Sequence, residues 1–535
     1  METNILITNA HVITMDSEQP FAEAVAIKGN KILAVGTNDD VLRCAGSSSI
    51  CIDAQGNSVL PGFIDSHMHL FIGCAAMDNV KLGSVESVAD LREALLNYRA
   101  IHPEQRWICG SHLRYIKKQN GSPITNQDLD EIIDDQPVVL MAYDYHTVWV
   151  NRKAMELAEV NEGDGTGILR EPSQYGRVLA KTGIWGQTIS PLTGVAADTP
   201  IQPQEMQKLI RKGMEITGRY GITSLHNMDG NIQILKMLLE AEACHELTAR
   251  IHLSKSITAQ SGIEALQEAD EMKKEAYSAV VSGGSVKLFM DGVIESETAS
   301  LLEPYATNSP NKGENLYSAD HLRETIAACQ RMNLQVIVHA IGDGAVRHTL
   351  NGFEQEPNHK GAFPFRHRIE HLELIHPDDI PRLKRLGVIA SMQPYHVPLF
   401  GEGDPIWMEK VGEARIKNGF LWQSIRQADA KLIFGSDWPV ASADPIKAMQ
   451  ACLTRQPLSG DASSQRQNIH DIIRSYTVDA AYAEHRENDL GKIRAGYLAD
   501  IVILSRDILI DPENTIGDTK VNMTIFDGRI VYEDV

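Results

Sequence analysis

The stretch PGFIDSHMHLF, residues 61–71, decides the fold, because it joins an apolar run to a pair of histidines. Successive side chains of an extended strand point to opposite faces, so His67 and His69 would lie on the same face. Imidazole nitrogens placed in this way can chelate one metal ion, and zinc accepts such nitrogens. Taken alone, the pair leaves a second interpretation open, namely surface histidines or core histidines with ordinary hydrogen-bond partners. The choice depends on ligands elsewhere in the chain.

Seven further apolar runs follow this one, with helical patterns between most of them. The runs lie at 221–228, 248–256, 285–292, 334–343, 365–374, 387–394 and 431–440. Helical patterns fall at 203–219, 231–245, 261–277, 319–332, 344–355, 377–386 and 411–428. Parallel strands need crossover connections, usually helical, so the pattern predicts a (β/α)8 TIM barrel.

The two ends of the chain are rich in strand patterns, and neither is long enough to bury a core alone. We therefore predict a small β-sandwich domain built from residues 1–60 and 488–535 together. The barrel would occupy 61–487. Only the gap after the first barrel run is long, which predicts a large insertion at about 78–200, near the active face.

Chemically active side chains stand where several barrel strands should end, which is where such barrels place their functional groups. His339 and His371 close apolar runs, and Asp437 closes the run LIFGSD. Buried histidines and carboxylates need partners, because burying an unpaired charge is costly. A shared metal centre that also includes His67 and His69 explains all five residues at once.

The same stretches resemble the amidohydrolase superfamily, and within it the YtcJ-like branch (amidohydrolase family three), which includes N-substituted formamide deformylases. The matching segments span nearly the whole chain. They include VLPGFIDSHMHL at 59–70, KLFMDGVIESETASLLEPY at 287–305, VIVHAIGDGAV at 336–346, RHRIEH at 366–371 and GSDWPV at 435–440. The resemblance adds Lys287, which would be N6-carboxylated and bridge two metal ions. Alternatively, an uncarboxylated Lys287 pairs with an acid beside a single metal.

The resemblance implies a hydrolase of carbon–nitrogen bonds, acting on an N-substituted amide or formamide through metal-activated hydroxide. One or two divalent ions, with zinc the best match to histidine nitrogen, would be held by His67, His69, Lys287, His339, His371 and Asp437. Asp437 would act as general base and then as general acid. Two alternatives remain open: a mononuclear deaminase or cyclic amidase, and a non-catalytic barrel that binds small molecules.

Further residues are expected around the ligands. Substrate contacts are expected from His146, Asp291 and Trp438. Asp65 shares a strand face with the histidine pair and could orient one of them, and His226 would support the ligands from its own barrel strand. Strand alternation predicts that Glu370, which precedes His371, points away from the site.

The composition excludes several other classes of protein. A net charge of −21 disfavours nucleic acid and anionic membranes as partners. No apolar run is long enough to cross a membrane, and the first residues lack the pattern of a signal peptide. The seven cysteines are scattered without a CxxC pair, which favours reduced thiols in the cytoplasm. We expect a small-molecule substrate, and the family resemblance suggests a homodimer.

Overall fold

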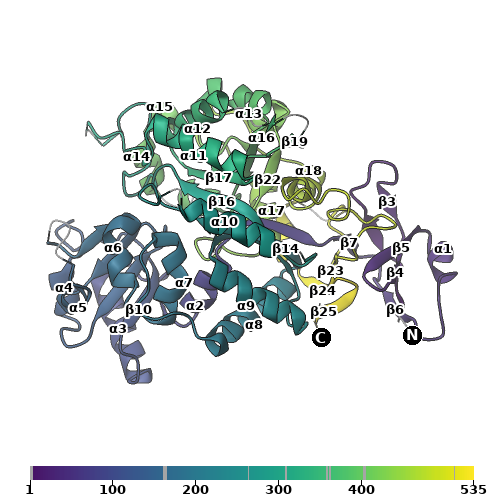
Figure 1. The fold of residues 1–535 in the computed structure, drawn as a ribbon, viewed down its shortest axis with the longest axis horizontal. Helices are drawn as coiled ribbons and strands as arrows, with labels where there is room; N and C mark the ends of the chain where they lie inside the picture. The colour runs from purple at the N-terminus through teal and green to yellow at the C-terminus, as the bar shows by residue number, and fades with distance from the viewer. Residues whose placement is uncertain are drawn as a thin grey trace.

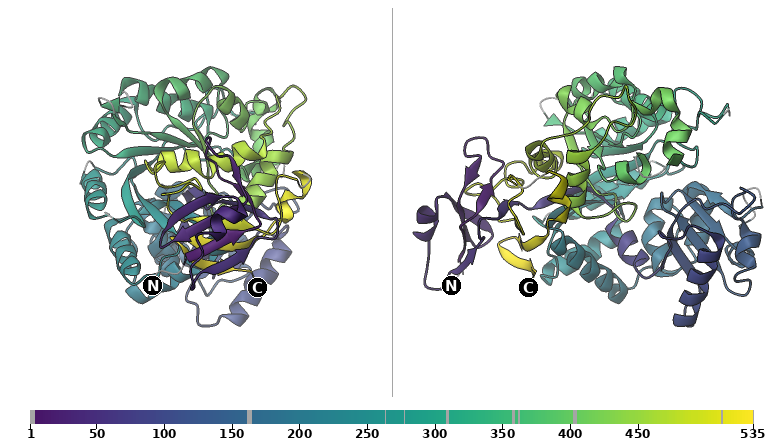
Figure 2. Two further views of the ribbon diagram at one scale, coloured as in Figure 1. Left: turned by 90° about the vertical axis from the view of Figure 1, so that its right-hand side faces the viewer. Right: turned by 180° about the vertical axis from the view of Figure 1, so that it is seen from behind.

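The computed structural model describes residues 4–160, 165–262, 264–276, 278–307, 310–356, 359–360, 363–401, 405–510 and 513–534. Figure 1 shows a central barrel between two smaller regions, a sheet domain at the right and a mixed α/β region at the lower left. The view from behind in Figure 2 shows the same three regions, with the two termini close together in the sheet domain.

The central sheet confirms the predicted (β/α)8 barrel. Its strands, in chain order, are β8 (Phe63–Met68), β14 (Ile222–Gly230), β15 (Arg250–Ser256), β16 (Val281–Phe289), β17 (Gln335–Ala340), β20 (Arg368–His371), β21 (Ile389–Met392) and β22 (Leu432–Phe434). Neighbouring strands in this order pair in parallel. The strands are buried along almost their whole length, which explains why they read as continuous apolar runs.

The barrel closes between its first and last strands, next to the opening histidine pair. A parallel bridge joins Met68 to Trp438. The N–H of Asp437 donates to the carbonyl of His67 at 2.7 Å, and the N–H of His69 donates to the carbonyl of Trp438 at 2.8 Å. Closure therefore brings the carboxyl ends of β8 and β22 side by side.

Helices cover the outside of the barrel, mostly where the sequence predicts them. They are α8 (Pro203–Arg219), α9 (Ile232–Ala243), α10 (Glu264–Glu275), α11 (Ala319–Arg331), α12 (Asp343–Gln355) and α13 (Ile380–Leu386). Helix α8 begins with a proline in its first turn and buries one apolar stripe that includes Met206, Leu209 and Ile210. This stripe is the 3.6-residue pattern of a helix that packs on a sheet.

The prediction of one helix at 411–428 is wrong. The structure has three shorter helices there, α14 (Pro405–Val411), α15 (Glu413–Ile416) and α16 (Trp422–Gln427). Gly412 has a φ of 82° and Phe420 a φ of 52°, and a right-handed helix cannot continue through a left-handed residue. The apolar spacing alone did not reveal these breaks.

The sheet domain combines strands from both ends of the chain in two sheets. One sheet has β5 (Lys31–Gly36), β4 (Ala24–Lys28), β1 (Asn4–Thr8) and β6 (Ile50–Asp53). The other has β25 (Arg529–Glu533), β24 (Val521–Phe526), β23 (Ile501–Leu504), β7 (Ser58–Pro61), β2 (His11–Ile13) and β3 (Phe21–Ala22). Their shared core joins N-terminal residues such as Val25 to C-terminal residues such as Ile525, so neither end buries it alone.

The region between β8 and β14 has a five-stranded sheet and an apolar core of its own. Its strands are β9 (Val80–Lys81), β10 (Ile108–Leu113), β11 (Val138–Ala142), β12 (Thr147–Val150) and β13 (Ile168–Arg170). Its helices include α2 (Leu70–Ala76), α3 (Val88–Ile101), α6 (Glu171–Leu179) and α7 (Ile184–Thr193). Among the helices of the described ranges, none is both long and apolar enough to span a bilayer.

Candidate metal site

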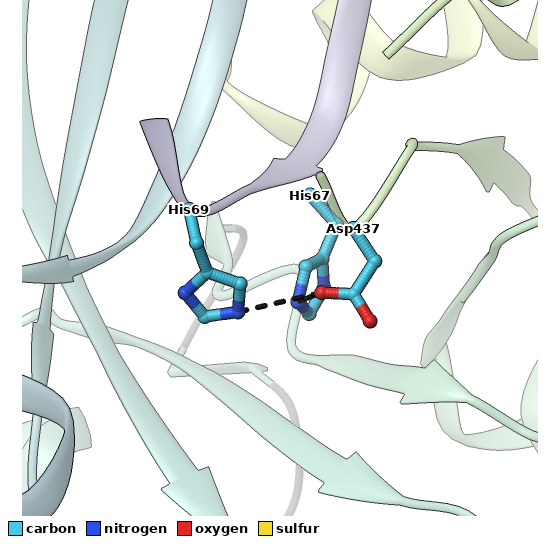
Figure 3. Close-up of side chains that lie close together, drawn as sticks. All are labelled: His67, His69 and Asp437. Atoms are coloured by element: carbon cyan, nitrogen blue, oxygen red, sulfur yellow. Dashed lines mark ion pairs between the residues drawn. The ribbon is translucent and has the colours of Figure 1, made fainter. Parts of the chain in front are cut away.

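Three ligand-type side chains meet where the barrel closes. Nε2 of His67 lies 3.3 Å from Oδ1 of Asp437, and Nε2 of His69 lies 3.4 Å from the same oxygen. All three residues are buried. Figure 3 shows His69 and Asp437 pointing toward one another from neighbouring strand ends, with His67 beside them. A set of two imidazole nitrogens and one carboxylate oxygen at this spacing could hold a divalent metal ion.

A buried carboxylate stands behind each histidine of this pair. Nδ1 of His67 donates to Oε2 of Glu370 at 2.6 Å, and Nδ1 of His69 donates to Oδ1 of Asp229 at 2.5 Å. A carboxylate only accepts hydrogen bonds, so Nδ1 of each ring carries a hydrogen. Asp229 and Asp437 outweigh burial and raise the pKa of His69 to about 9, so its Nε2 holds a proton that a metal ion would displace. Both Nε2 atoms face Asp437 with a carboxylate behind each ring, which is the arrangement typical of metal-ligating histidines. The donor set therefore fits a divalent transition metal.

The charge of Asp437 is set by the histidines around it. Burial alone would raise the pKa of its carboxyl, but His67, His69 and His371 outweigh burial and hold the pKa well below its usual range. Asp437 is therefore an ionised carboxylate, which suits it to face a cation.

Strand β16 carries Lys287 into the same interior. Its Nζ lies 3.5 Å from Nε2 of His67, and the side chain is fully buried. Burial lowers the pKa of Lys287 to about 8, although Glu370 and Asp437 oppose the shift. Near neutral pH a substantial fraction of the amine is thus accessible in its uncharged form, which is the form that reacts as a nucleophile.

The prediction that Glu370 points away from the site is wrong, since it accepts the hydrogen bond from His67. Arg368 pairs with the same carboxylate, its Nε lying 2.9 Å from Oε1. The physical reason is in the backbone that follows. His371 has a φ of 74° and Leu372 a φ of 46°, so regular alternation ends at the last residue of β20. Glu370 and His371 consequently both face the barrel interior.

His339 and His371 lie together on the neighbouring side of the interior. Their ring centroids are 4.5 Å apart, and the ring of His371 is 4.9 Å from that of His67. Nε2 of His339 donates to the carbonyl of Gly292 at 3.1 Å, and Nδ1 of His371 donates to Oε1 of Gln393 at 2.9 Å. Burial holds the pKa of both rings well below its usual range, so both are neutral, the form that binds metals.

His146 extends from the inserted region to the cavity in front of the ligands. Its ring lies 5.4 Å from that of His339, and its Nδ1 donates to Oε2 of Glu171 at 2.8 Å. Burial opposes protonation, but Glu171 and Asp144 outweigh it and raise the pKa of His146 to about 9. The structure thus places a protonated imidazole in the wall of the cavity in front of the ligands.

Asp291 and Trp438, the other two residues expected to contact substrate, contact other parts of the protein in the structure. The Asp291 carboxylate accepts three backbone N–H groups, those of Ser300, Ile341 and Gly342, at 2.8 to 3.0 Å. It therefore fixes loops beneath the site. The ring of Trp438 packs against α2, where Gly73 leaves room for it, whereas its neighbours Pro439 and Val440 line the cavity.

Asp65 and His226 support the site from behind. Oδ1 of Asp65 accepts the N–H of His67 at 3.1 Å and that of Ser436 at 2.9 Å, so it ties the first strand to the last through the backbone and not through an imidazole. His226 accepts from Nη1 of Arg368 at 2.6 Å and pairs with Glu484 at 2.8 Å. It reaches the ligands only through other side chains.

Two residues of the candidate site, Asp229 and His396, were not predicted from the sequence. Asp229 lies near the end of β14, in HNMDG, where the rule that selected Asp437 would also have selected it. His396 lies four residues beyond β21, in QPYH, and its Nε2 is 3.5 Å from Oδ2 of Asp437. His396 could have been found from its position, because it is a histidine that lies just past the end of a barrel strand, two residues beyond the apolar run at 387–394.

The rest of the cavity wall is largely apolar. It includes Ile72, Tyr145, Tyr175, Leu192, Phe289 and Val293. Tyr145, Tyr175 and Leu192 belong to the inserted region, whereas Phe289 ends barrel strand β16. The barrel thus supplies the polar floor, and the insertion supplies much of the wall that a substrate would contact.

A closed parallel barrel with histidines and an aspartate at its strand ends defines the class of barrel hydrolases. The chain belongs to the amidohydrolase family, whose sequence model matches residues 51–532. It is accordingly a hydrolase that acts on carbon–nitrogen bonds.

Individual relatives confirm the resemblance to the YtcJ-like branch. The chain is 26% identical to the putative amidohydrolase YtcJ of Bacillus subtilis, over 98% of each chain. It is 24% identical to the N-substituted formamide deformylase of Arthrobacter pascens, over 99% of this chain and 98% of that protein. A crystal structure of an uncharacterized metal-dependent hydrolase from Pyrococcus furiosus superposes with a TM-score of 0.71 at 27% identity, covering 93% of this chain and 97% of that one.

Proposed function

We propose that this amidohydrolase uses one or two divalent metal ions, with zinc the best fit, to hydrolyse an N-substituted amide or formamide. One observation carries the proposal: the Nε2 atoms of His67 and His69, each fixed by a carboxylate behind the ring, converge on Asp437. The similarity to an N-substituted formamide deformylase and to a metal-dependent hydrolase of Pyrococcus furiosus supports it. His339, His371 and Lys287 would complete the ligand set.

The protein's own residues would move the proton. A bound divalent metal supplies hydroxide at neutral pH, because it lowers the pKa of water from 15.7 to about 7. Asp437 takes the proton that water gives up as its oxygen bonds to the substrate carbonyl carbon. The carbon–nitrogen bond then breaks, and Asp437 delivers that proton to the leaving nitrogen, which yields an acid and an amine. His146, held by Glu171, would donate a hydrogen bond to the carbonyl oxygen.

The cavity wall favours a substrate with an apolar substituent. Side chains such as Ile72, Leu192 and Phe289 offer no hydrogen-bonding groups to a polar substituent. A charged group buried against them would lose its hydration without compensation. We therefore place the apolar N-substituent of the amide or formamide against this wall.

Metal analysis tests the proposal most directly. We expect purified protein to contain close to two equivalents of divalent metal by elemental analysis. The double variant His67→Ala/His69→Ala should lose at least one of them, because it removes both nitrogens of one cluster. His470→Gln is the control, since this histidine is exposed on α18 (Ile469–Ser475), outside the site. One equivalent in the native protein would favour the mononuclear deaminase or cyclic amidase, and none after reconstitution would refute metal-dependent hydrolysis.

Carboxylation of Lys287 is a separate expectation. The uncharged Nζ would form a bond to the carbon of CO2 and release a proton, which leaves an anionic carbamate able to bind metal. After incubation with ¹³C-bicarbonate, we expect a carbamate resonance in the ¹³C NMR spectrum of the native protein. Lys287→Gln should lack it, whereas Lys236→Gln, at an exposed lysine, should retain it. Identical spectra for the native protein and Lys287→Gln would show that Lys287 is not carboxylated.

A further inference from the structure

His396 lies in the loop that follows β21 and is buried against the candidate metal site. Its Nδ1 is 3.2 Å from Oε1 of Glu373, and its Nε2 is 3.5 Å from Oδ2 of Asp437. The other oxygen of Glu373 accepts the indole N–H of Trp407 at 2.9 Å. Glu373 is thus fixed at both oxygens, and it fixes the ring of His396 in turn.

This construction repeats that of the first two ligands. Three histidines each direct Nδ1 at a buried carboxylate and Nε2 at Asp437, namely His67 with Glu370, His69 with Asp229, and His396 with Glu373. Their Nε2 atoms lie within a narrow range, 3.3 to 3.5 Å, of an Asp437 oxygen. A carboxylate behind the ring fixes the tautomer whose lone pair is on Nε2. By this criterion, Nε2 of His396 is positioned to bind a cation, as are the Nε2 atoms of His67 and His69.

The two oxygens of Asp437 divide the histidines into two sets. Oδ1 faces His67 and His69, whereas Oδ2 faces His396 at 3.5 Å. The ring of His371 lies on the same side, its Nδ1 3.9 Å from Oδ2, and because Nδ1 donates to Gln393 this ring would bind a metal through Nε2. The rings of His371 and His396 lie nearly parallel, 8° apart, with centroids separated by 6.0 Å. Asp437 therefore stands between two clusters of possible ligands.

Three supported ring nitrogens and both oxygens of one carboxylate therefore converge on the same small space, which is the arrangement of a metal-binding site. We infer that His396 is a metal-ligating residue, which forms a second cluster with His371 and Asp437 beside the one built on His67 and His69. This inference rests on the proposed function, because it concerns a ligand of the same metal centre. It adds a position after the seventh barrel strand to the ligand set.

Zinc binding to metal-depleted protein tests the inference without reference to activity. The apoprotein is titrated with Zn²⁺ in competition with a chromogenic chelator, which gives the number of equivalents and their dissociation constants. For His396→Gln we expect the dissociation constant of one equivalent to rise at least about a hundredfold. Glu373→Gln keeps an oxygen for Trp407 but removes the carboxylate behind His396, and a rise of roughly 10- to 100-fold is expected. His470→Gln should bind as the native protein does.

The outcomes separate the inference from the proposed function. Unchanged stoichiometry and affinity in a folded His396→Gln protein would overturn the inference alone. No zinc uptake by the native protein would overturn both the inference and metal-dependent hydrolysis. If His396→Gln fails to fold, as judged by circular dichroism, Glu373→Gln decides: native affinity in that variant overturns the inference. In the Co²⁺-loaded protein, we also expect His396→Gln to alter the visible absorption bands of one ion.

Discussion

Replacing Asp437 with asparagine should lower kcat/KM for hydrolysis by at least about a thousandfold. General acid–base catalysis contributes roughly 10²- to 10⁴-fold, and Asp437 is proposed to carry both the base step and the acid step. Asparagine matches aspartate in shape but cannot take up a proton. It also removes the negative charge that faces the four surrounding histidines, so metal binding should weaken as well. Turnover of a panel of N-substituted formamides and amides would measure the loss.

A matched control lies seven residues further on. Asp444 caps helix α17 (Pro445–Thr454), its side chain accepting the N–H of Ile446. Asparagine caps helices about as well as aspartate, so Asp444→Asn should retain nearly native activity. Metal content must be measured on the same samples, because it separates lost proton transfer from lost metal. An Asp437→Asn enzyme with more than a tenth of native activity would refute the proposed role of Asp437.

Replacing Arg368 with methionine should destabilise the protein by about 3–5 kcal/mol, the usual cost of removing one partner of a buried ion pair. Arg368 and Glu370 are both fully buried. The guanidinium also donates to the carbonyl of Ser66 at 2.6 Å and to the hydroxyl of Ser391 at 3.1 Å. Its loss leaves the Glu370 carboxylate with only His67 as a close partner. Urea denaturation of the metal-free protein would measure the change in the free energy of unfolding.

The exposed pair of Arg99 and Asp135 provides the comparison. It has the same two-pronged geometry, with N–O distances of 2.9 and 2.7 Å, but both side chains are in contact with solvent. Arg99→Met should therefore leave the denaturation midpoint nearly unchanged. The double variant Arg368→Met/Glu370→Leu should be more stable than Arg368→Met alone, since no buried charge is left behind. Equal losses from Arg368→Met and Arg99→Met would contradict this account.

The barrel was predictable because its strands are buried on both faces and therefore appear as unbroken apolar runs. The proposed histidine and aspartate ligands were predictable because such barrels place reactive groups at strand ends, so His339 and Asp437 stood out without knowledge of their neighbours. Lys287 was added only by the family resemblance. Their convergence was not predictable in detail. It depends on closure between β8 and β22, which is a contact between residues far apart in the chain.

The errors have a common physical origin in backbone geometry beyond the ends of regular elements. Strand alternation predicted that the Glu370 side chain points away from the site. The two residues after it have positive φ angles, so the alternation does not continue through them. The helix predicted at 411–428 is interrupted at Gly412 for the same reason, a positive φ angle. His396 lies in a loop, where neither the strand period nor the helix period places a side chain. The homodimer and the cytoplasmic location stay predictions.

The division between a polar barrel floor and an insertion-built wall separates reactivity from recognition. Tyr145, Tyr175 and Leu192 come from the inserted region, although they pack against the main core of the barrel, and none of the six expected ligands comes from that region. Substitutions at wall positions such as Leu192 can reshape the chamber while the expected metal ligands, which all come from the barrel, keep their places. New substrate preferences are therefore accessible through a compact stretch of the chain, which makes the insertion the natural target for directed evolution.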